Sequence, residues 1–306
     1  MKIEWKGVYP ALTTKLTSTE QLDLSAFDNG VKEQVLAGVD GIILAGSLGE
    51  ASVLSEDEKQ ILLKHTVAHW GTQVPVIYGI SESTTTSAVQ CAVNAEKNGA
   101  SGLMLLPPMR YKSDTRETLQ FFKEVVTSVS LPVMVYNNPV DYKIEITIEM
   151  FETLAKYDNV QSVKESTRDI TNVTRMINHF GDRFSILCGV DTLALESMAA
   201  GSNGWVAGLV NAFPKETVAI YRLVKAGRMQ EALAIYRWFM PLLELDIHPK
   251  LVQYIKLAET YAGLGTEWVR APRLILEGEE RERISKIITD GIATRPSLPD
   301  YLSIKL

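Results

Sequence analysis

Residues 160–207 read VQSVKESTRDITNVTRMINHFGDRFSILCGVDTLALESMAAGSNGWVA, and this stretch decides the fold. Three short apolar runs, at 160–164, 184–188 and 203–207, are separated by two segments with helical patterning. The runs are apolar on successive residues, which is typical of parallel strands that helices cover on both faces. The stretch therefore predicts two strand–helix units followed by a third strand.

The same unit recurs toward the N-terminus. Five more strand candidates lie at 7–12, 40–45, 74–79, 101–106 and 132–137. Candidate caps mark the helices between them: a capping box of Ser55 with Glu58, then Ser83 or Thr84, Asp114, Thr147 and Asp169. Eight units in about 225 residues predict a closed (β/α)8 TIM barrel. An open doubly wound sheet is the alternative, but it rarely uses eight strands each followed by a helix.

The chain continues beyond the eighth unit. Its helix is expected over about 214–226, and Gly227 ends the pattern. Three further helical stretches follow near 228–247, 249–262 and 279–290. We therefore predict a catalytic barrel over 1–226 and a C-terminal helical extension over 227–306, which has a packing or assembly role.

Composition narrows the class of protein. The 306 residues are 46% hydrophobic and 22% charged, the balance of a soluble globular enzyme. The net charge of −6 and the lack of a basic stripe argue against a nucleic-acid partner. The opening MKIEWKGVYP does not resemble a signal peptide, and no apolar run is long enough to span a bilayer. A cytoplasmic location without a membrane partner is expected.

The histidines and cysteines do not predict a metal site. His65 and His69 are one helical turn apart, but on a helix expected outside the barrel. His179 and His248 are isolated from them in sequence. We interpret Cys91 and Cys188 as packing residues, although Cys188 ends a predicted strand and could contact the site.

Lys164 is the most informative polar residue. The active site of this fold forms at the C-terminal ends of the strands, and Lys164 ends the run at 160–164. Desolvation favours the neutral form of an amine, which is the form that condenses with a carbonyl. The ordinary alternative is a lysine that reaches solvent or pairs with Glu165.

Tyr136 ends the neighbouring strand candidate. Adjacent strands lie about 4.8 Å apart, so the phenol and the amine can face one pocket. The phenol could relay protons during bond cleavage, and a structural tyrosine at the barrel mouth is the alternative.

The run Gly46-Ser47-Leu48-Gly49-Glu50 follows the second strand candidate. Its glycines permit a tight turn that exposes backbone N–H groups to a carboxylate or phosphate, and Ser47 adds a hydroxyl. An ordinary loop is the alternative. Further candidates for substrate contact are Arg110, Asn138, Asp141, Gly189, Asp191 and Gly208.

Together these segments resemble one known family. Gly46-Ser47-x-Gly49-Glu50, Tyr136-Asn137-x-Pro139 and Val163-Lys164-Glu165-Ser166 are similar to motifs of the dihydrodipicolinate synthase and N-acetylneuraminate lyase family. The resemblance implies a metal-free and cofactor-free lyase in which Lys164 forms the Schiff base and Tyr136 relays protons. Ser47 and the amides of the 46–49 turn would hold the carboxylate of a 2-oxo acid. It also implies a homo-oligomer, a dimer or tetramer.

Three positions depart from the synthase pattern. Leu48 stands where a second hydroxyl residue is usual, and Arg110 stands where a tyrosine is usual. Asp141 replaces an arginine that would bind the carboxylate of the second substrate. Arg110 could supply a new anion contact or could be a solvated loop residue.

Among the branches of the family, Gly46-Ser47-Leu48-Gly49-Glu50 together with Tyr136-Asn137-Asn138-Pro139 most resembles the hydroxyproline-pathway deaminases. These convert 1-pyrroline-4-hydroxy-2-carboxylate to 2,5-dioxopentanoate. A 2-keto-3-deoxy sugar acid aldolase or dehydratase is the next hypothesis. Dihydrodipicolinate synthase proper and N-acetylneuraminate cleavage follow. The non-enzymatic alternative is a homologue that binds a 2-oxo acid without turnover.

Overall fold

The structure is a computed structural model that describes residues 3–108 and 111–306. Its centre is one parallel eight-stranded sheet in the order β1-β8-β7-β6-β5-β4-β3-β2. The strands are β1 (Gly7–Pro10), β2 (Ile42–Leu44), β3 (Val76–Ile80), β4 (Gly102–Leu105), β5 (Val133–Asn137), β6 (Val160–Glu165), β7 (Ser185–Cys188) and β8 (Gly204–Ala207). A parallel bridge between Ala11 and Ile43 closes the cylinder between β1 and β2. The predicted TIM barrel is confirmed.

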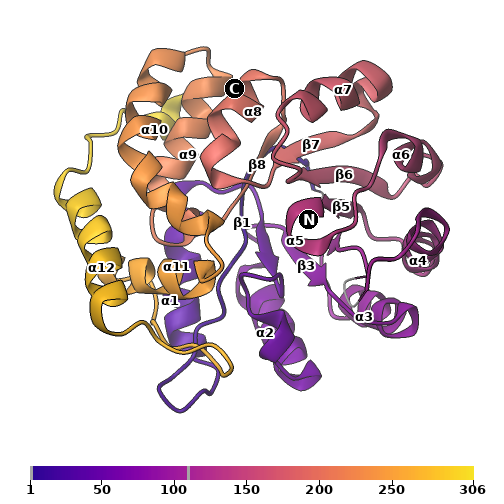
Figure 1. The fold of residues 1–306 in the computed structure, drawn as a ribbon, viewed down its shortest axis with the longest axis horizontal. Coiled ribbons are helices and arrows are strands. Elements are labelled where there is room, and N and C mark those ends of the chain that lie inside the picture. The colour runs from indigo at the N-terminus through magenta and orange to yellow at the C-terminus, as the bar shows by residue number, and fades with distance from the viewer. Residues whose placement is uncertain (1–2, 109–110) are drawn as a thin grey trace.

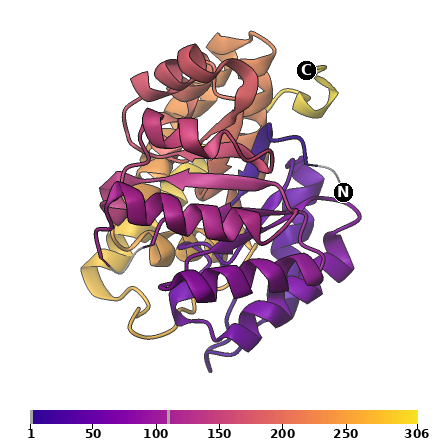
Figure 2. The ribbon, with the colours of Figure 1, turned by 90° about the vertical axis from the view of Figure 1, so that its right-hand side faces the viewer.

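Most of the helices surround the strands, and one short helix after β5 lies at the barrel mouth (Figures 1 and 2). They are α1 (Leu24–Ala37), α2 (Glu56–Trp70), α3 (Thr85–Lys97), α4 (Thr115–Thr127), α5 (Pro139–Tyr142), α6 (Ile148–Leu154), α7 (Thr171–Phe180), α8 (Ala194–Ala199) and α9 (Pro214–Lys225). The strands are almost wholly buried because the helices cover one face of the sheet and the barrel interior covers the other. In the part of the chain that the structure describes, no helix combines the length and apolar character needed to cross a membrane.

Most helices begin at the predicted caps. Ser55 and Asp114 each form a complete capping box, with Glu58 and Glu117 respectively. Thr84 and Thr147 accept from the first turns of α3 and α6. Asp169 is different: the cap position of α7 is Ile170, although the Asp169 carboxylate still accepts from the Thr171 N–H at 3.0 Å.

The C-terminal extension lies against one side of the barrel, beside α1 and α9 (Figure 1). It consists of α10 (Met229–Leu243), a 3-10 turn η5 (Glu244–Ile247), α11 (Leu251–Ala262) and α12 (Gly278–Ala293). A single hydrophobic cluster joins the extension to strands β1 and β8 and to helix α9. The extension is therefore packed into the barrel's own core.

Candidate active site

Lys164 lies at the C-terminal end of β6, directly opposite Tyr136 in the register with β5. The residue is only 7% exposed. Space for its side chain depends on Gly189, which follows β7: a Cβ there would come within 2.7 Å of the Lys164 Cγ and Cε atoms. The Lys164 side chain therefore extends into the barrel mouth, and Gly189 leaves room for it.

The Lys164 amine has no ion pair or hydrogen bond with any described residue. Its Nζ lies 4.1 Å from the centroid of the Tyr136 ring. Burial lowers the pKa of Lys164, and the negative charges of nearby groups, Asp246 among them, oppose this shift only in part. The site therefore favours the neutral, nucleophilic amine.

Glu165 does not pair with Lys164, because successive residues of a strand point to opposite sides. Its carboxylate accepts from Asn172 Nδ2 at 2.9 Å and from the Thr167 N–H at 2.8 Å. The alternative of a simple ion pair between Lys164 and Glu165 is therefore not observed.

Tyr136 belongs to a short chain of polar groups. Its hydroxyl accepts from Asn138 Nδ2 at 3.0 Å, and the same amide donates to the Asp141 carboxylate at 2.7 Å. Burial raises the pKa of Tyr136 to about 12, although hydrogen bonds from Asn138 and Ser166 oppose the shift. The phenol thus keeps its proton at neutral pH and is held beside the amine, as a proton relay requires.

The loop after β2 offers a cradle for an anion. Ala45 and Glu50 adopt left-handed backbone conformations, with φ of 53° and 57°, and these bracket the turn. Among the described residues, no hydrogen bond uses the N–H groups of Ser47 and Leu48. Two free amides and the Ser47 hydroxyl are the donors that a carboxylate needs.

Tyr142 is a site residue that the sequence reasoning missed. It ends α5, and its hydroxyl lies 2.6 Å from the Ser47 Oγ. Its ring meets the Tyr136 ring edge to face, with centroids 5.5 Å apart. Burial raises the pKa of Tyr142, so this phenol is also protonated at neutral pH. A second tyrosine shortly after the Tyr136-Asn137-Asn138-Pro139 run was the available signal.

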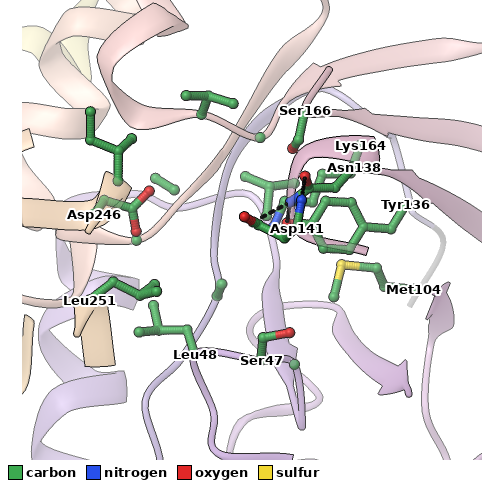
Figure 3. Close-up of a pocket in the computed structure, with 18 of the residues that line it drawn as sticks. Ser47, Leu48, Met104, Tyr136, Asn138, Asp141, Lys164, Ser166, Asp246 and Leu251 are labelled. Atoms are coloured by element: carbon green, nitrogen blue, oxygen red, sulfur yellow. Dashed lines mark hydrogen bonds between the residues drawn. The ribbon is translucent and has the colours of Figure 1, made fainter. Parts of the chain in front are cut away.

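These groups surround one cavity of about 720 Å³, a volume that includes its open mouth (Figure 3). Nine of the predicted residues line it: Gly46, Ser47, Leu48, Tyr136, Asn138, Asp141, Lys164, Gly189 and Gly208. Eleven further residues that line it were not predicted as site residues: Ala11, Met104, Tyr142, Ser166, Arg168, Val190, Val206, Ala207, Asp246, Ile247 and Leu251. The last three come from the extension, which therefore completes the site.

Two predicted contacts lie behind the cavity wall. The Asp191 carboxylate accepts from Trp205 Nε1 at 2.8 Å and from the Leu209 N–H at 2.7 Å, so it ties the β8 loop to β7 and points away from a ligand. Gly49 packs against the Leu12 carbonyl, and its own carbonyl accepts from Thr14. Both residues support the wall. Arg110 lies outside the described residues.

Arg168 is a second cation at the rim. Its side chain is exposed, has no ion pair with the described residues and lies on a backbone with φ of 64°. It is free to meet an anionic group that enters the cavity. Its position after β6 and four residues beyond Lys164 was the only sequence signal.

One group of potential metal ligands gathers away from this cavity. Glu56, Glu82 and Cys91 bring ligand atoms within 4.8 Å of one another. Lys59 already binds Glu82 at 3.0 Å, and burial raises the pKa of Cys91 to about 12. A lysine ammonium and a protonated thiol do not suit a divalent cation.

Comparison with known proteins identifies the same architecture. Residues 4–290 match the model of the dihydrodipicolinate synthetase family. A 4-hydroxy-tetrahydrodipicolinate synthase from Exiguobacterium sibiricum is 32% identical over 89% of this chain and 92% of its own length.

Solved structures agree with this match. A dihydrodipicolinate synthase from Bacillus anthracis superposes with a TM-score of 0.91 at 25% identity, over 96% of this chain and 100% of that one. A dihydrodipicolinate synthase from Aquifex aeolicus gives a TM-score of 0.89 at 26% identity, over 93% of this chain and 97% of that one.

Proposed function

This chain belongs to the dihydrodipicolinate synthetase family, and on that premise we propose that it is a lyase that binds its substrate as a Schiff base on Lys164. One observation carries the proposal: a buried amine that has no ion-pair partner within residues 3–108 and 111–306 faces a cavity at the C-terminal mouth of the barrel. A buried lysine normally requires a partner, so an unpaired one indicates a nucleophile. No cofactor is needed, because a protonated imine is itself the electron sink.

The other groups have complementary roles. The carboxylate of a 2-oxo acid, or of its cyclic imine, would bind the Ser47 hydroxyl and the amides of Ser47 and Leu48. Tyr136, beside the amine, would carry protons to and from the adjacent carbon. Tyr142 would orient the Ser47 hydroxyl through their hydrogen bond.

We propose further that the substrate is 1-pyrroline-4-hydroxy-2-carboxylate. Lys164 Nζ adds to the C2=N carbon, the C2–N ring bond breaks, and C5 keeps the nitrogen as an ammonium. The 4-hydroxyl leaves as water, which gives a C3=C4 double bond. Loss of protons from C5 and its ammonium, with protonation at C3 and then at C4, moves the double bond to C5=N. Hydrolysis of the imines at C5 and C2 consumes two waters. One water is consumed overall, and the products are ammonia and 2,5-dioxopentanoate.

An acidic side chain in the cavity favours 1-pyrroline-4-hydroxy-2-carboxylate as the substrate. Asp246 lines the cavity on the side opposite Lys164, whereas Asp141, which also lines it, lies beside Asn138 and Tyr136 (Figure 3). The ring-opened intermediate carries an ammonium at its end away from Lys164, and the Asp246 carboxyl group, even when protonated, can accept a hydrogen bond from it.

Dihydrodipicolinate synthesis is the second candidate, and the names of the relatives favour it. Its second substrate carries a carboxylate that an arginine binds in the synthase pattern. This chain has Asp141 at that position, and an acidic group there repels a carboxylate. Among the described residues that line the cavity, Arg168 is the cation at the rim that could compensate.

Borohydride trapping with intact-mass readout tests the chemistry. The parent protein, Lys164→Ala and the exposed-helix control Lys123→Ala are incubated with pyruvate or with the pyrroline. We expect an adduct on the parent and on Lys123→Ala but not on Lys164→Ala, and ammonia release from the pyrroline alone.

The other outcomes separate the alternatives. Condensation of the synthase's own substrates without ammonia release would favour the synthase, and rapid pyruvate release from a 2-keto-3-deoxy sugar acid would favour an aldolase. The absence of any adduct on the parent would contradict the Schiff-base mechanism and favour a ligand-binding homologue.

A further inference from the structure

The cavity has a wall that does not come from the barrel. Asp246 and Ile247 in η5 and Leu251 at the start of α11 close the side opposite Lys164 (Figure 3). Among these three, only Asp246 can exchange a proton. The C-terminal extension thus places a carboxyl group in the cavity, where it can take part in the reaction.

Gly208, which follows β8, makes room for this carboxyl group. A Cβ at Gly208 would lie 2.2 Å from the Asp246 Oδ1 and 2.9 Å from its Cγ. The carboxyl therefore packs directly against the backbone of the barrel mouth, at a place where any side chain would displace it. Gly189 does the same for Lys164, so two strand-end glycines admit the two facing side chains.

The extension holds Asp246 firmly in place. Tyr236 on α10 donates to the Asp191 carbonyl at 3.0 Å, which ties α10 to the loop after β7. On α11, Lys256 pairs with Glu50 at 2.6 Å, and both side chains are fully buried. The turn that carries Asp246 is thus anchored on both sides to barrel loops.

The charges that face Asp246 come from three elements. Lys164 lies on β6, Asp191 follows β7 and Asp141 lies on α5. Burial is the main reason that the pKa of Asp246 is raised well above its usual value, the carboxylate of Asp191 adds to the shift, and Lys164 opposes it. A raised pKa favours the protonated form of the carboxyl group, which is the form that can donate a proton.

We propose that Asp246 is a catalytic residue, the general acid that protonates the hydroxyl leaving from the substrate. This inference rests on the proposed function. In the enamine on Lys164, the nitrogen lone pair re-forms C2=N and the C2=C3 pair moves to C3=C4. The C4–O bond breaks, and its electron pair takes the Asp246 proton, so that water leaves. The resulting Asp246 carboxylate recovers a proton from solvent.

The positions of Lys164, Tyr136 and Asp246 match these separate roles. Lys164 and Tyr136 occupy one side of the cavity, where C2 and C3 react, and Asp246 faces them from the other side (Figure 3). A leaving group two carbons from the imine carbon is thereby directed away from Tyr136 and toward the extension. Acid assistance of this kind contributes about 10²–10⁴-fold to a rate.

The test compares Asp246→Asn and Asp246→Glu with Glu244→Gln, an exposed carboxylate on the same turn. We expect Asp246→Asn still to form the pyruvate adduct, but to lose about 10²–10⁴-fold in kcat on the pyrroline. Trapping with the pyrroline should then capture an adduct that still carries the hydroxyl, whereas the parent yields the dehydrated adduct. Asp246→Glu should recover part of the rate, and Glu244→Gln should match the parent.

The pH profile adds a second readout. The kcat of the parent should fall as the pH rises through the pKa of Asp246, and this limb should be absent in Asp246→Asn. Normal pyrroline turnover by Asp246→Asn would overturn the inference alone. Pyruvate trapping by a parent that never releases ammonia would overturn the deaminase function and the role of Asp246 with it.

Discussion

Breaking the buried pair between Lys256 and Glu50 should destabilise the whole protein. The two charged atoms lie 2.6 Å apart, and neither side chain is exposed. Lys256→Met leaves the Glu50 carboxylate buried without its cation, which costs about 3–5 kcal/mol. At about 2 °C per kcal/mol for a chain of this length, the Tm should fall by about 6–10 °C.

Calorimetry or circular dichroism of three variants measures this effect. Lys256→Met combined with Glu50→Met should recover most of the loss, because an apolar pair of similar volume needs no charge compensation. Lys286→Ala is the matched control: its ion pair with Asp290 spans 2.8 Å, but the side chains are 75% and 62% exposed. Such a pair contributes about 0.5 kcal/mol or less. A Tm loss in Lys256→Met no larger than in this control would refute the reasoning.

Two further predictions concern the lysine and an acidic transition. Gly189→Ala should prevent formation of the pyruvate adduct in trapping experiments, because the new Cβ would come within 2.7 Å of the Lys164 side chain. Circular dichroism should still report a folded protein. Normal trapping by this variant would contradict the packing argument. Arg270 lowers the pKa of Glu58 from 4.5 to about 2, so the ionised pair stabilises the fold above pH 4.5 and is lost as the pH falls toward 2. Glu58→Gln should therefore lower the free energy of unfolding by about 1–2 kcal/mol at pH 7, after allowance for solvent screening, and by a smaller amount at pH 3. Urea unfolding at the two pH values measures this difference.

Much of this molecule could be predicted from its sequence, because the deciding signals are local. Strands buried on both faces need successive apolar residues, and all eight runs became strands within a few residues of the expected limits. In a parallel barrel every strand ends at the same mouth, so Lys164 and Tyr136 could be brought together without knowing any contact. The helix caps are equally local, which explains why four of the five expected caps are observed.

Which polar groups face the cavity depends on contacts between segments that are far apart in the chain. Asp191 follows a strand like Lys164, yet the amides of the β8 loop turn its carboxylate away. Asp246 sits in a turn with no motif of its own, and it reaches the cavity because buried contacts seat the extension on the barrel. A strand end sets where a side chain starts, whereas its direction and its neighbours depend on packing between segments distant in sequence. For this reason the sequence determines the barrel and the position of Lys164, whereas the position of Asp246 in the cavity wall depends on the tertiary structure.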